Sequence, residues 1–376
     1  MEVYLDNSAT TRVCASAAQA ALDAMTAEYG NPSSLHSKGL AAKKILDDAR
    51  RAAAERLGGL PEEIFFSHSG TLANNAAVFG AVQAKRRAGN RIVTTAAEHP
   101  SVGKCMDELE RQGFEVIRLK PASDGNIPAE ALQEAVNEKT ILVSMMLVNN
   151  ETGAIFPVEQ IRRAVRAANA PALIHTDAIQ AFGKLPVRLS SLGVDLLTAS
   201  GHKLHAPKGV GLLYVKKGVG LKPFVYGGGQ ENGLFSGTQP LPAVAGFGAA
   251  IREADVSTHL PAAKENMRFL RGLLEHIPAV RFNSPADASP YILNFSVEGI
   301  PSQVTINFLS AREIYVSAGS ACKKGHRSEV LTAMGLPPDR IDTALRVSLS
   351  RFTTKEELTA FADALSDAVK TVRTKL

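Results

Sequence analysis

A lysine and an aspartate stand at the ends of two apolar runs of the chain, and together these residue types can do cofactor chemistry. Lys203 follows the run 194–199, and Asp177 directly follows the run 172–176. Partial desolvation lowers the pKa of a lysine, so that its neutral amine can form an imine with an aldehyde cofactor. An aspartate held against a pyridine nitrogen keeps that nitrogen protonated, which turns the ring into an electron sink.

A turn and a histidine occupy matching positions after two other apolar runs. Ser69–Thr71 comes between the run 64–67 and a helical pattern, and the unpaired amides of a helix N-terminus can cradle a phosphate. His99 follows the run 91–95, and its ring can stack on a flat cofactor and carry protons. Each feature alone has an ordinary explanation, such as an aspartate that merely caps the next helix. Their convergence is what favours a single site.

These residues require a fold that brings strand ends to one edge. Short β-rich runs alternate with longer helical patterns between residues 60 and 215, which is typical of a mostly parallel sheet covered by helices. The candidate strands are 64–67, 91–95, 115–119, 141–148, 172–176, 194–199 and 211–215. The candidate helices among them are 41–57, 72–88, 102–112, 129–136 and 158–168. Ligands bind in the crevice at the carboxyl edge of such sheets, so the chemistry is expected there.

The C-terminal part of the chain has a different character. An amphipathic stretch at 260–277, a strand-like run at 291–297 and a helical pattern at 355–372 predict a smaller α+β unit. At 376 residues, the chain also exceeds what one hydrophobic core usually supports. We therefore expect two domains. Residues 15–255 should form a large α/β domain with a seven-stranded, mostly parallel sheet, and residues 1–14 and 256–376 should form a small α+β domain.

Composition narrows the class of protein. Apolar residues make up 45% and charged residues 21%, as in soluble globular proteins. No apolar run approaches the ~20 residues that cross a bilayer, and the N-terminus has no basic, hydrophobic leader, so a cytoplasmic protein is expected. Cys14, Cys105 and Cys322 are too few for a disulfide framework or a zinc cluster, and no metal is expected. The charge of +5 is dispersed, and the basic stretch 322–327 has no interleaved aromatics, so direct nucleic-acid binding is not expected.

A series of short motifs extends along nearly the whole chain. They are Tyr4–Thr11, Gly30–Ser34, Glu98–His99, Val148–Gly153, Thr176–Gln180, Ser200–Lys203, Gly227–Gln230, Ser236–Thr238, Gly319–Cys322, Leu345–Arg346 and Arg351–Thr353. In this order they resemble the motifs of NifS/IscS-like cysteine desulfurases, which belong to the class V aminotransferase group of fold-type I pyridoxal-phosphate enzymes. The resemblance implies that fold, that cofactor and a homodimer.

The resemblance also implies a role for each site residue. Lys203 holds pyridoxal 5'-phosphate, Asp177 pairs with its ring nitrogen, and His99 stacks on the ring. The side chains near the phenolic oxygen are Gln180 and Asn150. The phosphate is expected to bind Gly70, Thr71, Ser200 and His202, with Thr238 reaching over from the second subunit. The substrate carboxylate is expected to bind the forked guanidinium of Arg346, with help from Asn31.

The implied reaction removes sulfur from L-cysteine. Cys322, as thiolate, attacks the substrate sulfur, and the products are alanine and a persulfide on Cys322. Lys323, Lys324 and His326 supply positive charge that should lower the pKa of this thiol. The sulfur would then pass to an acceptor protein for iron–sulfur cluster assembly or for thiolation of tRNA or a cofactor. Without the resemblance, Cys322 would be read as a buried structural cysteine.

Three departures from the family pattern bear on the pocket. Leu72 replaces a common glutamate, Phe235 replaces a common arginine, and the segment 322–331 is shorter and more basic than in long-loop members. These departures leave substrate fit and the reach of Cys322 open. The alternatives are a selenocysteine lyase, another class V aminotransferase or lyase, and a catalytically silent scaffold in a sulfur relay.

Overall fold

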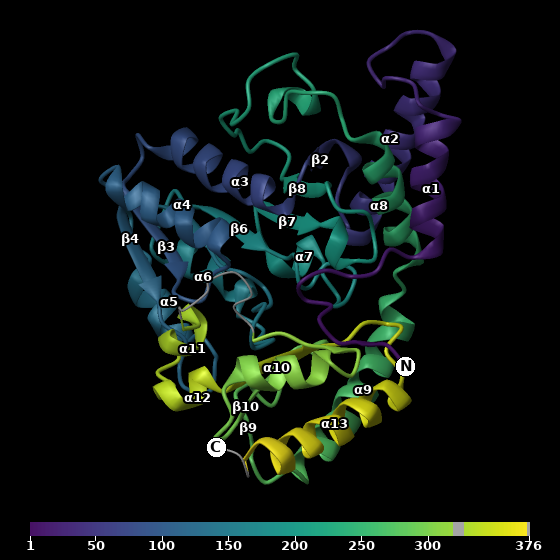
Figure 1. Cartoon of the computed structure of the whole chain (residues 1–376). Coiled ribbons are helices and arrows are strands. Elements are labelled where there is room, and N and C mark those ends of the chain that lie inside the picture. The colour runs from purple at the N-terminus through teal and green to yellow at the C-terminus, as the bar shows by residue number, and fades with distance from the viewer. Residues whose placement is uncertain (319–326, 374–376) are drawn as a thin grey trace.

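The structure is a computed structural model and describes residues 1–318 and 327–373. Its central element is a seven-stranded sheet (Figure 1). Its strands are β2 (Ile64–Ser67), β3 (Arg91–Thr95), β4 (Glu115–Leu119), β5 (Thr140–Ser144), β6 (Leu173–Asp177), β7 (Leu196–Ser200) and β8 (Gly211–Val215). The spatial order is β2-β8-β7-β6-β5-β3-β4, and β8 runs in the opposite direction to the other six strands of this sheet. The expected mostly parallel sheet of seven strands is confirmed.

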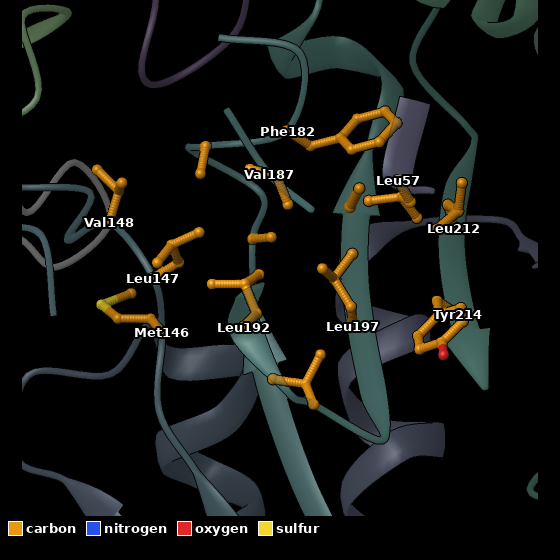
Figure 2. Close-up of a cluster of buried hydrophobic side chains, with 14 of the residues drawn as sticks. Leu57, Met146, Leu147, Val148, Phe182, Val187, Leu192, Leu197, Leu212 and Tyr214 are labelled. Atoms are coloured by element: carbon orange, nitrogen blue, oxygen red, sulfur yellow. The ribbon is translucent and has the colours of Figure 1, made fainter. Parts of the chain in front are cut away.

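Helices cover both faces of this sheet because its strands are apolar on both sides. The helices of this part of the chain are α1 (Ala15–Thr26), α2 (Ser37–Leu57), α3 (Gly70–Lys85), α4 (Pro100–Arg111), α5 (Ala129–Ala135), α6 (Val158–Ala167), α7 (Leu189–Leu192) and α8 (Leu241–Glu253). One apolar cluster joins α3 and α4 to strand residues such as Leu196 and Leu213, and another joins α2 and α8 to Leu197 and Leu212. Figure 2 shows part of this second apolar cluster, in which Leu197 and Leu212 lie near Leu57 of α2.

A second set of elements has its own core. Strands β9 (Val280–Phe282), β10 (Ile292–Val297) and β12 (Ala344–Ser348) form an antiparallel sheet, and β1 (Val3–Tyr4) pairs with β11 (Ile314–Tyr315). The helices here are α9 (Val256–Glu275), α10 (Ser302–Ser310), α11 (Glu329–Ala333), α12 (Pro338–Asp342) and α13 (Lys355–Arg373). Among the described residues, their main apolar cluster consists of Val3, Leu5 and residues between 267 and 369. We propose on this basis that residues 1–14 and 256–376 form one domain and residues 15–255 the other.

The sheet topology brings several strand ends to one edge. Strands β3, β5, β6 and β7 are parallel, and β2 points the same way because β8 is antiparallel to both β2 and β7. The segments that follow these five strands therefore leave from the same edge of the sheet. No helix in the described parts of the chain is long and apolar enough to span a bilayer.

Candidate active site

Asp177 and Lys203 come from adjacent strands at this edge. Asp177 ends β6 and is buried, and Lys203 lies in the single 3-10 turn that follows β7. Burial raises the pKa of the Asp177 carboxyl, while the charges of His99 and Lys203 act in the opposite direction. Lys203 is thus within electrostatic reach of Asp177, as a site shared by the two side chains requires.

A buried hydrogen-bond network joins Asp177 to His99. Asn74 Nδ2 donates to Asp177 Oδ2 at 2.7 Å and to Ser101 Oγ at 2.8 Å, and Ser101 Oγ lies 2.8 Å from His99 Nδ1. Thr198 Oγ1 donates to Asn74 Oδ1 at 2.5 Å, so both ends of this amide are held by hydrogen bonds. The carboxylate and the imidazole are therefore held by one network.

His99 is the N-cap residue of helix α4. Its Nδ1 accepts a hydrogen bond from Ser101 N at 3.1 Å, while the side chain keeps an exposed surface. The surrounding protein lowers the pKa of His99 mainly by desolvation, and the charges of Lys203 and Arg346 lower it further. A neutral imidazole with an open face is suited both to stacking and to proton transfer.

The predicted anion-binding turn lies at the N-terminus of α3. Ser69 caps the helix, accepting from Leu72 N at 3.1 Å through its hydroxyl and from Ala73 N through its carbonyl, so the amides of Gly70 and Thr71 lie outside these two bonds. A Cβ on Gly70 would come within 2.6 Å of Ile179 Cδ1. The glycine thus permits a close approach between this helix and the turn that follows β6, which contains Ile179.

Ser200 lies beside this turn, and His202 follows Ser200 in the 3-10 turn after β7. Ser200 is buried at the end of β7, and its Cβ lies 3.1 Å from the position of a Cβ on Gly70. His202 Nδ1 lies 3.2 Å from Thr10 Oγ1, and burial lowers its pKa to about 4. The phosphate-binding role of both side chains remains a prediction, in which His202 would act as a neutral donor.

The N-terminal segment crosses over the crevice. Lys203 Nζ donates to the backbone carbonyls of Ser8 and of Ala9, the latter at 2.7 Å. Gln180 Nε2 donates to the same Ser8 carbonyl at 3.0 Å. Gln180 therefore presents its amide nitrogen on the side of the crevice where Lys203 lies, which is the orientation that donation to a phenolic oxygen requires.

Arg346 connects the second sheet to the crevice. It is buried on β12, donates to Asn150 O at 2.9 Å and pairs with Asp6 Oδ1 at 2.8 Å. Its charge also acts on His99, which places the guanidinium near the ring site. The side-chain Oδ1 of Asn150 is buried without a hydrogen-bond partner among the described residues. A forked guanidinium beside the crevice matches the predicted carboxylate-binding role.

Two predicted residues lie exposed, away from the crevice of their own chain, and a third is not among the described residues. Asn31 lies exposed between α1 and α2, where its Oδ1 accepts from Ser33 N at 2.9 Å. Thr238 is exposed in the segment between β8 and α8, as expected for a residue that serves another subunit. Cys322 lies outside the described residues, together with Lys323, Lys324 and His326. Their roles remain predictions.

The two side chains that depart from the family pattern have a common environment. Phe235 is buried in the apolar cluster formed by α3, α4 and the sheet, and Leu72 packs against this cluster. A lone glutamate or arginine here would be a charge at an apolar boundary. Both departures remove charge, so the pair is chemically consistent, and neither side chain lies among the groups that surround Lys203.

The residues present fit pyridoxal phosphate. The donor set consists of a lysine amine, a buried carboxylate, an imidazole with an open face and the amides of a helix N-terminus, and each matches one part of the cofactor. Asn150 Oδ1, which is buried without a hydrogen-bond partner among the described residues, is a further polar atom at the crevice. No cluster of histidine, cysteine and acidic side chains suited to a metal occurs within residues 1–318 and 327–373.

The pattern-based prediction missed several side chains of the network. Asn74 and Ser101 join Asp177 to His99, Asp6 pairs with Arg346, and Lys184 contacts Gln180. One signal could have revealed Asn74, because it is a polar residue on the apolar face of a predicted helix. The Asp6–Arg346 pair joins segments distant in sequence, whereas the Ser101–His99 and Lys184–Gln180 contacts are local but join residue types that are common in turns and helix starts.

Comparison with known proteins places the chain in a family. The profile of the family described as aminotransferase class-V matches residues 3–361. The curated "Cysteine desulfurase 2" of Trichormus variabilis is 40% identical, with 99% of this chain and 94% of the relative covered. "Cysteine desulfurase IscS" of Methanosarcina thermophila is 37% identical, with 99% of this chain and 93% of that protein covered.

Solved structures agree with the sequence relatives. A structure titled "NIFS-LIKE PROTEIN" superposes with a TM-score of 0.93 at 36% identity, covering 98% of this chain and 100% of the other. Another, titled "SspA in complex with cysteine", has a TM-score of 0.83 at 31% identity and covers 94% and 100% of the two chains. On the strength of a profile match over most of its length and of full-length relatives, this chain belongs to the class V aminotransferase family.

Proposed function

We propose that the protein is a pyridoxal-phosphate-dependent cysteine desulfurase. The observation that carries this proposal is the convergence of Lys203, Asp177 and His99 at one sheet edge, with Arg346 beside them. The relatives named above are cysteine desulfurases, and one solved neighbour is described as a complex with cysteine. Their names favour this activity over a selenocysteine lyase or a silent scaffold.

Each residue of the crevice then has a task. Lys203 would hold the cofactor, Asp177 would pair with its ring nitrogen, and His99 would cover its face and carry protons. The bound cofactor supplies an electron sink for the bonds around the substrate's α-carbon. Arg346 would hold the substrate carboxylate, and it is already oriented by Asp6 and by the Asn150 carbonyl. The phosphate would lie at the N-terminus of α3, beside Ser200 and His202.

Sulfur would leave the substrate through Cys322. The carbon–sulfur bond of L-cysteine breaks, a sulfur–sulfur bond forms on the Cys322 thiolate, and alanine leaves with the proton that replaces the sulfur. The two other cysteines are unsuited to this task, because Cys14 and Cys105 are buried and burial raises the pKa of Cys105 to about 12. An acceptor protein serving iron–sulfur cluster assembly or thiolation of tRNA or a cofactor would then take the sulfur.

A homodimer is part of this proposal. Large apolar side chains are exposed in two segments, including Tyr29 (67%) and Leu35 (92%) near the α1–α2 connection and Tyr226 (83%) between β8 and α8. Both segments project from the same end of the molecule (Figure 1), and residues of both line one cleft of about 290 Å³. A second subunit covering this end would bury these side chains and would bring Thr238 toward a neighbouring site.

Replacing Cys322 tests the proposed chemistry. In Cys322→Ala, we expect unchanged cofactor absorbance and loss of sulfide release from L-cysteine in the presence of a reducing thiol, because only the sulfur-accepting atom is removed. Cys14→Ala provides the matched control and should retain turnover. Desulfuration at the parent rate by Cys322→Ala would show that the nucleophile is wrongly assigned, and a colourless wild-type protein that borohydride does not modify at Lys203 would refute the enzyme itself.

A further inference from the structure

Lys184 is a buried lysine that the proposed reaction does not use. Its side chain is only 8% exposed, although lysine is almost never buried without a partner. It lies in the turn that follows β6, after Gly183, whose φ is +71° and whose added Cβ would come within 2.5 Å of Leu204 Cδ1. The glycine thus allows a tight turn that carries Lys184 inward, toward Gln180.

A chain of hydrogen bonds leads from Lys184 to Lys203. Lys184 Nζ donates to Gln180 Oε1 at 3.4 Å, and Gln180 Nε2 donates to Ser8 O at 3.0 Å. The same Ser8 carbonyl accepts from Lys203 Nζ. Two amines are therefore connected through one side-chain amide and one backbone carbonyl.

The chemistry of these groups fixes the direction of the Gln180 amide. An ammonium can only donate, so the amide oxygen must face Lys184, and a carbonyl can only accept, so the amide nitrogen must face Ser8. We infer that Lys184 is a positioning residue, whose ammonium holds Gln180 with its amide nitrogen turned into the crevice as a donor to the phenolic oxygen of the cofactor. The inference deepens the proposed function and rests on it.

The surroundings of Lys184 do not provide a simpler explanation for its burial. In the part of the chain that the structure describes, its electrostatic neighbours are the cations Lys203 and Arg346. Burial lowers its pKa to about 7, and these charges act in the same direction. The cleft behind it is lined by His205, His259 and Arg351 and so adds no carboxylate. A buried cation without a counter-ion destabilises a fold, so its retention indicates a role in the site.

The test measures cofactor binding at pH 6.5, where Lys184 keeps most of its proton. Pyridoxal phosphate is titrated into cofactor-free wild type, Lys184→Met, Lys184→Arg, Gln180→Ala and the double variant Lys184→Met/Gln180→Ala. We expect roughly five- to tenfold weaker binding in Lys184→Met, the size of one ordinary net hydrogen bond, with a shifted visible absorption maximum. Lys184→Arg should restore both properties because it remains a donor. The exposed Lys208, replaced by methionine, controls for loss of a nearby positive charge.

The double variant separates positioning from a general structural effect. If Lys184 acts through Gln180, the double variant binds no more weakly than Gln180→Ala alone. Additive losses, or wild-type binding and absorption in Lys184→Met, would overturn the inference. Should Lys184→Met fail to fold, Gln180→Glu serves instead: its carboxylate should pair with Lys184, raising the melting temperature while weakening cofactor binding, and an unchanged melting temperature contradicts the contact. Failure of the wild type to bind pyridoxal phosphate would refute the proposed function rather than this inference.

Discussion

Glu98, the neighbour of His99, carries a proton that affects the stability of the fold. Its Oε1 accepts from Thr95 Oγ1 at 2.8 Å and from Met146 N at 3.0 Å, whereas its Oε2 is buried without a partner among the described residues. Burial raises the pKa of this carboxyl from about 4.5 to about 8. The folded protein thus keeps a proton that the unfolded chain has lost.

The sign of the resulting pH dependence follows from this difference. Below pH 4.5 both states are protonated, and between 4.5 and 8 only the folded state is, so stability falls as pH rises through this window. The slope reaches about 1.4 kcal/mol per pH unit. In Glu98→Gln we expect this loss to disappear, so that the variant gains several kcal/mol relative to wild type between pH 5 and pH 8. Urea unfolding of both proteins at the two pH values measures it.

Glu134→Gln, at an exposed position, controls for the removal of one charge. A constant difference in unfolding free energy between Glu98→Gln and wild type across this range would contradict the prediction, because it would mean that Glu98 is ionised in the folded protein already at pH 5.

Residues that act at strand ends could be predicted from the sequence, and residues that act through long-range contacts could not. Lys203, Asp177 and His99 each follow an apolar run, and the run itself marks the sheet edge. Lys184 looks like any lysine in a turn, because its burial depends on the tight turn at Gly183, which lies against Leu204, and its role depends on how the fold orients Gln180. Such contacts become visible only when the fold is known.

Helix α3 depends on the small size of its first residue. A methyl group on Gly70 would lie 2.6 Å from Ile179 Cδ1 and 3.1 Å from Ser200 Cβ, so α3 would have to move away from β6 and β7. We expect Gly70→Ala to cost about 1–3 kcal/mol of unfolding free energy. It should also weaken pyridoxal phosphate binding, because the amides at the helix N-terminus move with it. Urea unfolding and cofactor titration measure the two effects.

The matched control is Gly103→Ala in the neighbouring helix α4. No atom lies within 4 Å of the added methyl group at this position. The substitution should therefore stabilise the protein by roughly 0.5–1 kcal/mol through helix propensity alone. Equal effects at the two glycines would mean that α3 tolerates a side chain at its start, and the close approach to Ile179 would have no functional meaning.

At the scale of elements, periodicity predicted the sheet well and the second domain only in part. The strands β2, β3, β4 and β8 begin and end where the apolar runs do. The direction of β8 could not be read from its residues, because a buried strand has the same apolar pattern in either direction. Strand β12, which carries Arg346, was not predicted, since its five residues resemble many short runs of mixed character and its pairing with β10 joins segments about fifty residues apart.

At the scale of the whole molecule, the placement of Thr238 decides whether one chain is sufficient for activity. Thr238 is exposed in its own chain, in a segment that also exposes Tyr226. If Thr238 completes the phosphate site of a second subunit, then each active site draws residues from two chains. Two different inactive variants should then complement each other, in a pattern that depends on which chain supplies Thr238.

The experiment combines Lys203→Ala with Thr238→Asp, whose carboxylate should repel the phosphate. In a mixed dimer, the site built around Lys203 of the Thr238→Asp subunit receives an intact Thr238 from its partner, and the other site carries both defects. Co-expression with two affinity tags allows mixed dimers to be isolated, and random pairing of an unfractionated mixture should yield about one quarter of wild-type activity. Each variant alone serves as the control and should be nearly inactive. If Thr238 served its own chain, every site in the mixed dimer would be defective, and no activity would return.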